Sequence, residues 1–391
     1  MIINVVALAL IPLALAAPAP VAADDSRLIV TLRGSTNRGE FMRTVRGRFT
    51  GRDAFRHTYK TALSGFSGSF SSETAAFLRS SAQVEAVEED GVMSISDIQA
   101  DATWGLQCIT QQSKLADTDP FALTYDYPFA APAGAGAIVY VVDTGIRATH
   151  EDFGGRAKMA AQFGGYALTD GNGHGTHCAG TIGGTSFGVA KNVQIRGIKV
   201  LSDTGSGSTS DVIAGIDYAV SQFRTNYLPS VISLSLGGSF SSATNAAIER
   251  AVAAGVHCAV AAGNSNVDAC TASPASAARA ITVGALNILD ERAFYSNYGK
   301  CVDIFAPGSN VTSAWFGSDT QTRTISGTSM ATPHTAGVMA YYLAQQNIST
   351  DAMATKLVSE ASRGQINMAF DAAAVRNEAK SPTPNLMMFR S

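Results

Sequence analysis

The stretch GNGHGTHCAG, residues 171–180, brings two histidines and a cysteine within five positions of the chain. These side chains can ligate a metal ion, form a redox centre, or supply the base of a nucleophilic catalyst. His174, His177 and Cys178 could bind zinc, but the sequence holds no second cluster of Cys and His with matching spacing. The choice therefore depends on which reactive residues stand elsewhere in the chain.

Three other residues stand where an apolar run ends or an apolar helical pattern begins. Asp143 follows the run AIVYVV, Asn264 follows VHCAVAAG, and Ser329 lies in SGTSMATPH, just before a helical pattern. Each has an ordinary interpretation as a loop cap, a turn residue or a helix N-cap. Together with His174 they supply a carboxylate, an imidazole, a hydroxyl and an amide donor. This set is the one needed for acyl transfer.

The order of these residues along the chain narrows the chemistry. Asp143, His174 and Ser329 run acid, base, nucleophile, which is the order of subtilisins and of neither chymotrypsins nor α/β-hydrolases. The segment GTSMA does not fit G-x-S-x-G, because Ala331 replaces the last glycine. Two alternatives stay open on the residues alone: Cys178 as the nucleophile beside an imidazole, and a secreted binding or inhibitory protein without activity.

The elements that must position these residues can be predicted from apolar patterns. From Trp104 onward, helical spacing appears over 212–223 and over 246–254, which ends before Gly255. We expect Pro333 in the first turn of the helix that follows Ser329. Runs of strand length alternate with these helices at 137–142, 195–201, 231–236, 256–262 and 280–285. This pattern predicts an α/β fold with a mainly parallel sheet covered on both faces, and a site beyond the carboxyl ends of its strands.

The first quarter of the chain differs from the rest. Between Arg27 and Lys60 there are nine basic residues against two acids. Residues 27–32 read as a strand, 71–81 as a helix with a serine cap, and 84–95 as a second strand. The polar stretch 96–103 reads as a cleavable junction. We therefore expect a small α+β domain before the main one.

Four motifs, VVDTGI, GHGTHCAG, AAGN and SGTSMATPH, together resemble those of subtilisin-type serine peptidases, in particular the proteinase K branch. The likeness runs from Trp104 to the mid-340s and beyond, and residues 27–95 resemble an inhibitory propeptide. The resemblance implies a three-layer subtilisin-like fold. It makes His174 the base, Asp143 its orienting acid, Ser329 the nucleophile and Asn264 the oxyanion donor. It makes Cys178 a buried free thiol.

The resemblance also implies where a substrate lies. An extended polypeptide would pair with two backbone edges, and its P1 side chain would enter a pocket with no acidic residue, so we expect broad cleavage after apolar and aromatic residues. Thr209 stands where proteinase K has an aromatic lid over a distal subsite. The implied substrate-binding residues are Gly205, Ser206, Gly207, Ser235, Leu236, Gly237, Gly238, Ala261, Ala262 and Gly263.

By the same resemblance, Cys270 pairs with Cys301, and one Ca²⁺ is held by the carbonyls of Ala278 and Ala280 and the carboxylate of Asp303. Cys108 has no evident partner. Asn310 and Asn347 stand in glycosylation sequons, which matter only in a eukaryotic host.

We expect residues 1–16 to be a signal peptide, 17–97 an inhibitory propeptide and 98–391 the peptidase domain. The product would be a secreted monomer that acts on polypeptides and is inhibited by its own propeptide. A net charge of −3 gives no reason to expect nucleic acid as a partner, and no later stretch is apolar enough to cross a membrane.

Overall fold

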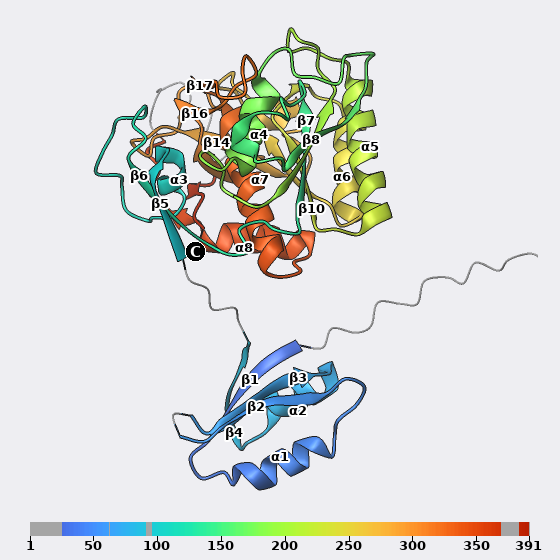
Figure 1. Ribbon diagram of the computed structural model, residues 1–391, viewed down its shortest axis with the longest axis vertical. Helices are drawn as coiled ribbons and strands as arrows, with labels where there is room; N and C mark the ends of the chain where they lie inside the picture. Colours follow the sequence, from blue (N-terminus) through green and yellow to red (C-terminus); the bar gives the residue numbers. More distant parts are fainter. Residues whose placement is uncertain (1–25, 62, 91–95, 369–382, 391) are drawn as a thin grey trace, which may run out of the picture. The chain divides into compact units, whose positions relative to one another are not determined.

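A computed structural model describes residues 26–61, 63–90, 96–368 and 383–390; the expected signal peptide lies outside them. The chain divides into two compact units, Met1–Met93 and Ser94–Ser391, and each is described by itself (Figure 1). Within the described residues, no helix has the length and apolarity needed to span a bilayer.

The first unit packs two helices on one face of a four-stranded antiparallel sheet of order β2-β3-β1-β4. Its core joins alternate residues of the central strand, such as Leu28 and Val30, to helix residues such as Phe41 and Leu78. The elements are β1 (Ser26–Leu32), α1 (Arg38–Arg46), β2 (Ala54–Tyr59), β3 (Gly65–Phe70), α2 (Ser72–Ser80) and β4 (Val84–Glu89).

The sequence predicted β1, α2 and β4 but missed α1, β2 and β3. Strand β3, GFSGSF, lacks an apolar alternation because it needs small residues. A Cβ on Gly65 would lie 2.1 Å from the carbonyl oxygen of Val30, and one on Gly68 would lie 2.2 Å from that of Ala54. Because these positions must be glycine, the alternation of apolar and polar residues that indicates a strand is missing.

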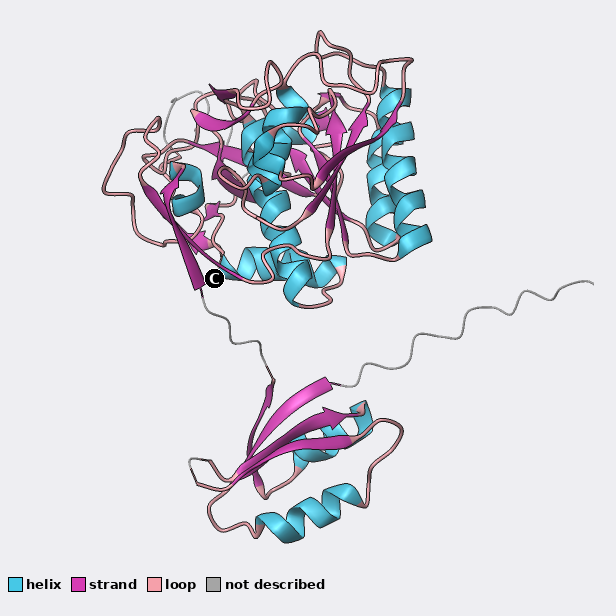
Figure 2. Cartoon of the chain, in the orientation of Figure 1, coloured by secondary structure: helices cyan, strands magenta, loops and turns pink. Residues whose placement is uncertain are grey.

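The second unit is built on a nine-stranded sheet of order β18-β19-β15-β14-β12-β10-β7-β9-β8 (Figures 1 and 2). All neighbouring pairs are parallel except β18 with β19. The strands of the sheet are β7 (Ile138–Asp143), β8 (Ala157–Gln162), β9 (Gln194–Lys199), β10 (Ser230–Leu234), β12 (His257–Ala261), β14 (Ile281–Leu286), β15 (Ile304–Pro307), β18 (Ser362–Arg363) and β19 (Leu386–Met387).

Helices cover both faces of this sheet. One face packs against α4 and α7, and the other against α5 and α6 (Figure 1). The helices are α3 (Trp104–Cys108), α4 (His174–Gly183), α5 (Thr209–Asn226), α6 (Ser242–Ala253), α7 (Thr328–Gln345) and α8 (Thr350–Glu360), with short 3-10 turns η1 (Glu151–Phe153) and η2 (Ala269–Thr271). Within β7, Val139 and Val141 join one core, while Tyr140 and Val142 join the other. This explains its unbroken apolar run.

Three two-stranded pairs complete the unit: β5 (Ser96–Ala102) with β6 (Tyr125–Ala130), β11 (Gly238–Ser239) with β13 (Ala272–Ser273), and β16 (Val311–Ala314) with β17 (Thr322–Ile325). The stretch 96–103, expected to be a cleavable junction, contains β5 over Ser96–Ala102; its cleavage stays a prediction. A short polar segment can pair through its backbone groups alone, so its composition gave no strand signal.

Helix α7 also differs from the prediction. It begins at Thr328, so Pro333 lies in the second turn rather than the first. A proline there has no N–H to donate to the carbonyl four residues earlier, which is that of Ser329. That carbonyl instead accepts hydrogen bonds from the Ser235 hydroxyl at 2.8 Å and from the Cys178 thiol at 3.4 Å.

Candidate active site

Asp143 ends β7, the strand at which the order of the sheet reverses direction. Ligand sites of open α/β sheets form at such a point, beyond the carboxyl ends of the strands. The side chain is fully buried, and its Oδ1 accepts the N–H of Thr144 at 2.7 Å. A carboxylate in that place needs a further partner.

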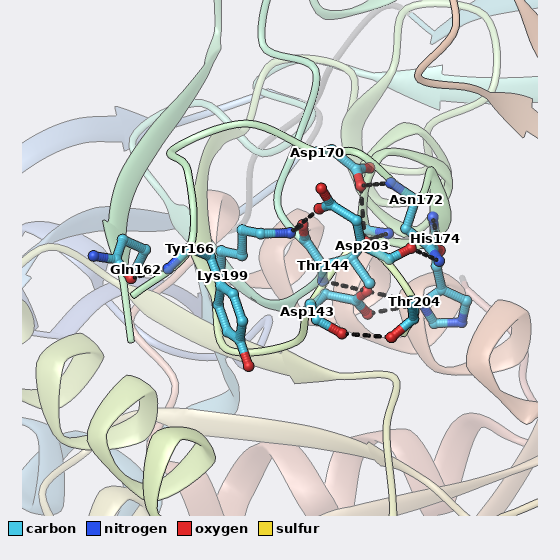
Figure 3. Close-up of polar contacts among 12 residues, drawn as sticks. Asp143, Thr144, Gln162, Tyr166, Asp170, Asn172, His174, Lys199, Asp203 and Thr204 are labelled. Carbon is cyan, nitrogen blue, oxygen red and sulfur yellow. Dashed lines mark hydrogen bonds and ion pairs between the residues drawn. The ribbon is translucent and has the colours of Figure 1, made fainter. Parts of the chain in front are cut away.

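His174 supplies that partner from the first turn of α4. The helix approaches the loop after β7 so closely that a Cβ on Gly175 would lie 2.1 Å from the carbonyl oxygen of Gly145. A glycine after the histidine is therefore required. The Nδ1 atom of His174 lies 2.8 Å from Oδ1 and 3.0 Å from Oδ2 of Asp143 (Figure 3).

The protonation of His174 follows from this contact. Burial alone would lower its pKa, but the charge of Asp143 and the hydrogen bond to it raise the pKa well above the usual value near 6.5. The carboxylate also fixes the tautomer, because Nδ1 must carry a proton to donate to it. Nε2 is thereby left as the basic nitrogen.

Ser329 lies at the amino end of α7, where unpaired N–H groups and the helix dipole favour negative charge. Its hydroxyl donates to the carbonyl of Ser235 at 3.0 Å. Cys178 contacts both Ser329 and His174. Its Sγ atom lies 3.4 Å from the Ser329 carbonyl oxygen and 4.0 Å from His174 Nδ1. The structure thus brings the three expected residues to one place, with the serine hydroxyl on a backbone acceptor in this state.

Asn264 is held in one orientation by Thr328. Its Oδ1 accepts the Thr328 N–H at 2.8 Å and the Thr328 hydroxyl at 3.0 Å. A backbone N–H can only donate, so the amide oxygen must face Thr328 and the Nδ2 group must point away. A Cβ on Gly327 would lie 3.4 Å from Asn264 Nδ2 and 3.6 Å from the N atom of Ser329. Two donors therefore border the same space, which glycine leaves open.

The zinc alternative does not match the arrangement. His177 turns away from His174, and its Nε2 contacts the carbonyls of Val311 and Arg323 at 3.0 and 3.1 Å. Burial lowers the pKa of His177 to about 3. Within the described residues, one group of possible ligands clusters, Asp143 with His174 and Cys178. Burial raises the pKa of the Cys178 thiol, which keeps it protonated and a poor ligand or nucleophile.

Two adjoining hollows run past these residues. One, of about 250 Å³, is bounded by Asn264 and Ser329, and the other, of about 700 Å³, by His174. Every residue named above as substrate-binding lines at least one of them. Gly205, Ser206, Gly207 and Ser235 line the larger, Ala261, Ala262 and Gly263 the smaller, and Leu236, Gly237 and Gly238 both.

The structure adds residues that the sequence did not reveal. Phe240 lines the larger hollow with 60% of its surface exposed, and Asn297 lines the smaller. Asp170 accepts the Asn172 N–H at 3.0 Å, the Thr144 hydroxyl at 3.0 Å and the Thr176 hydroxyl at 2.6 Å, which fixes the loop before His174. The only available signal was the polar character of DGN beside the histidine.

Cys270 and Cys301 form the disulfide, as expected. Cys108, Cys178 and Cys258 are buried free thiols.

The expected calcium ligands lie just before two adjacent parallel strands, Ala278 and Ala280 before β14 and Asp303 before β15. The Asp303 N–H donates to the carbonyl of Thr282 at 2.9 Å, and the Thr282 N–H donates to Asp303 Oδ2 at 2.7 Å. This fixes the carboxylate two residues from Ala280. Burial raises the pKa of Asp303 to about 6, although the Thr282 N–H acts in the opposite direction. A half-buried carboxylate in this position suits a hard cation held with backbone carbonyls.

Comparison with known protein families gives two matches. Residues 134–380 match the Subtilase family, and residues 32–96 match the peptidase inhibitor I9 family.

Curated relatives are similar over most of their length. An alkaline serine protease, ver112, from Corniculantispora psalliotae is 44% identical over 362 residues, which cover 89% of this chain and 91% of that protein. Proteinase R from Parengyodontium album is 46% identical over 290 residues, 73% of this chain and 72% of that one. A solved structure of a cold adapted subtilisin-like serine proteinase shares 42% identity with a TM-score of 0.64, and covers 74% of this chain and 99% of its own.

Proposed function

Because this chain belongs to the subtilase family and is a subtilisin-like serine protease with an inhibitor-type propeptide, we propose that it cleaves polypeptides through an acyl-enzyme on Ser329. Asp143 and His174 complete the triad. The Ser329 oxygen attacks the scissile carbonyl carbon while His174 Nε2 takes its proton, and His174 then protonates the leaving amine. Water then attacks the ester carbonyl in the same way, with His174 as the base. This step releases the carboxylic acid product and regenerates the Ser329 hydroxyl.

Asn264 and the Ser329 N–H are the proposed oxyanion donors. Support comes from the two anchors that Thr328 places on the amide oxygen of Asn264, since they direct Nδ2 to the space bordered by the Ser329 N atom. Donors held in advance stabilise the developing charge without reorganising. This convergence of an amide and a backbone N–H, near His174 and its buried partner Asp143, is the observation on which the proposal rests most heavily.

The smaller hollow is proposed to hold the P1 side chain. Ala261, Ala272 and Ala275 contribute small apolar surfaces to it, and no carboxylate occurs among the described residues that line it. Its volume of about 250 Å³ suits a large apolar or aromatic side chain, and nothing in it would pair with a basic one. We therefore propose broad cleavage after apolar and aromatic residues.

Asp303, Ala278 and Ala280 are proposed to hold one structural Ca²⁺. When bound, the ion would neutralise a carboxylate that burial otherwise makes costly to ionise.

We propose export, with a signal peptide over 1–16 and a propeptide over 17–97, and self-processing at Asp97–Ile98. Both residues of that bond lie in β5, where they pair with Phe129 and Pro128 of β6. Strand β5 must therefore leave β6 before the bond can reach Ser329 of the same molecule. After cleavage, the new terminus can take the observed place.

The test of the triad uses the matured protein and a neutral chromogenic tetrapeptide amide. Ser329→Ala should abolish hydrolysis, an organophosphonate should label Ser329 stoichiometrically, and a chelator should leave the initial rate unchanged. Ser326→Ala, three residues away and exposed, is the matched control. Activity retained by Ser329→Ala, or lost at once to the chelator, would refute the proposal.

The test of maturation uses a host without other secreted proteases. Ser329→Ala should accumulate as one chain beginning near Ala17, whereas the wild type should begin near Ile98. Processing of Ser329→Ala at the same bond in that host would exclude self-cleavage by this triad.

A further inference from the structure

The loop that carries the expected substrate edge Gly205–Gly207 is closed at its base by a tight turn. The Gly205 N–H donates to the Ser202 carbonyl at 3.0 Å, and the Ser202 N–H donates to the Ser206 carbonyl at 2.8 Å. Asp203 lies within this turn. It lines neither hollow, yet it is bonded in two directions toward the Asp143–His174 pair (Figure 3).

The first connection runs through a buried cation. The Lys199 Nζ atom, on a side chain only 1% exposed, donates to the Asp203 carboxylate at 2.8 Å and to the carbonyl of Thr144 at 2.5 Å. Thr144 directly follows Asp143, and Lys199 is the β9 partner of Asp143 in register. The Lys199 hydrogen bond holds the pKa of Asp203 below its usual value, which favours the carboxylate form of Asp203.

The second connection runs through an amide. Asn172 Nδ2 donates to the backbone carbonyl of Asp203 at 2.9 Å, and Asn172 Oδ1 accepts the N–H of His174 at 3.2 Å. A Cβ on Gly171 would lie 2.4 Å from the Asp203 carboxylate, so that carboxylate also packs on the backbone before Asn172. The carbonyl of Asp203 is thereby linked to the backbone of the catalytic histidine.

The two connections meet again at Asp170, which accepts both the Thr144 hydroxyl and the Asn172 N–H. The result is a closed ring of polar contacts, Asp203–Lys199–Thr144–Asp170–Asn172–Asp203. A displacement of the turn at Asp203 would stretch a bond to the segment of Asp143, to that of His174, or to both. The Lys199 side chain is buried while that of Asp203 is 63% exposed, so loss of the carboxylate would leave the buried ammonium with the Thr144 carbonyl and would weaken the ring at this link.

We propose that Asp203 is a positioning residue that couples occupancy of the Gly205–Gly207 edge to the alignment of Asp143 and His174. The inference rests on the proposed function and names a regulation of that same site. A substrate long enough to pair with the edge would restrain the loop and, through the ring, the catalytic pair. Binding energy from a remote part of the substrate would then appear in kcat and not only in KM.

The experiment compares two chromogenic amides on the matured enzyme. One is a blocked single residue that occupies the P1 pocket, and the other is a tetrapeptide with the same P1 residue that reaches the edge. We expect Asp203→Asn to lower kcat for the tetrapeptide about tenfold and to leave kcat for the short amide within about twofold, a size typical of residues that touch neither ligand. Asp203→Glu should recover most of the loss.

The matched control is Asp351→Asn, which removes the exposed ion pair between Asp351 of α8 and Arg279. It should leave kcat unchanged for both amides. Lys199→Met should give the same split between substrates. Because both residues act in one link, the double variant with Asp203→Asn should lose no more than the larger single effect. Active sites are counted with the organophosphonate, so that unfolded protein does not enter kcat.

An equal fall in kcat on both amides, a change confined to the KM of the tetrapeptide, or no change at all would overturn the inference. These outcomes are distinct from failure of the proposed function. If the proposed function is wrong, Ser329→Ala retains hydrolysis, whatever the kinetics of Asp203→Asn.

Discussion

Replacing Asp303 by asparagine tests whether one half-buried carboxyl sets both the pH dependence and the calcium dependence of stability. In the calcium-free protein, burial raises the pKa of Asp303 from 3.8 to about 6. The folded state therefore keeps this proton up to a higher pH than the unfolded state does. Stability must fall as the pH rises from about 4 to about 6, and must stay low above that range.

The magnitude follows from the size of the pKa change. A difference of about two pKa units at about 1.4 kcal/mol each makes ionised Asp303 cost about 3 kcal/mol of unfolding free energy above pH 6. For a domain of this size that corresponds to about 6 °C in Tm. Calcium bound to the carboxylate reverses the cost, and Asp303→Asn removes both effects.

The assay uses enzyme matured and then blocked at Ser329 by an organophosphonate, which prevents self-digestion. Melting is followed at pH 4 and pH 7.5, with chelator or with calcium. In chelator, Asp303→Asn should melt about 6 °C above its parent at pH 7.5 and together with it at pH 4. Calcium should raise the Tm of the parent and leave that of Asp303→Asn unchanged.

Asp290→Asn is the control, because Asp290 is a second carboxyl whose pKa is raised by burial. It should share the pH effect and keep the full calcium response. A calcium response undiminished in Asp303→Asn would place the ion elsewhere. The same Tm difference at both pH values would show that the Asp303 pKa is not raised.

Further predictions concern the oxyanion, the base and the disulfide. Asn264→Ala should lower kcat by about 10²–10³-fold with KM little changed. This magnitude is taken from the oxyanion asparagine of subtilisin. The acid limb of kcat/KM should lie above pH 6.5, because a raised pKa keeps His174 protonated, and Asp143→Asn should move the limb to lower pH. Replacing Cys270 and Cys301 by serine opens a loop with a sequence separation of 31 and should cost about 3–4 kcal/mol, measured by denaturant unfolding of the blocked enzyme.

The sequence predicted the site best where a reactive residue stands next to a recognisable strand or helix pattern. Position alone favoured a loop cap for Asp143, and only its order along the chain with His174 and Ser329 indicated a catalytic acid; the structure puts it at the end of β7. The parallel sheet was predictable because apolar runs such as that of β10 are buried on both faces. His174 and Ser329 followed from the order of acid, base and nucleophile along the chain and from the resemblance of their motifs to those of subtilisin-type peptidases.

Residues whose role depends on loop geometry could not be predicted. Asp203 and Asn172 are separated by 31 positions, and only the folded loops bring them into contact. Phe240 stands in a short polar stretch with no periodic signal. Pro333 was placed one turn too early, because its acceptable position depends on partners for the Ser329 carbonyl that come from other elements.

Those partners bear on when the chain acquires its activity during folding. The carbonyl of Ser329, the proposed nucleophile, is held by Ser235, 94 positions away, and by Cys178, 151 positions away. Contacts between such distant segments require closure of long loops and form late. A partly folded chain with α7 already formed would have a serine whose peptide group is not yet fixed. We therefore expect the enzyme to stay unable to cut other copies of itself until β10 and α4 have both docked, which protects the nascent chains when they are most vulnerable to proteolysis.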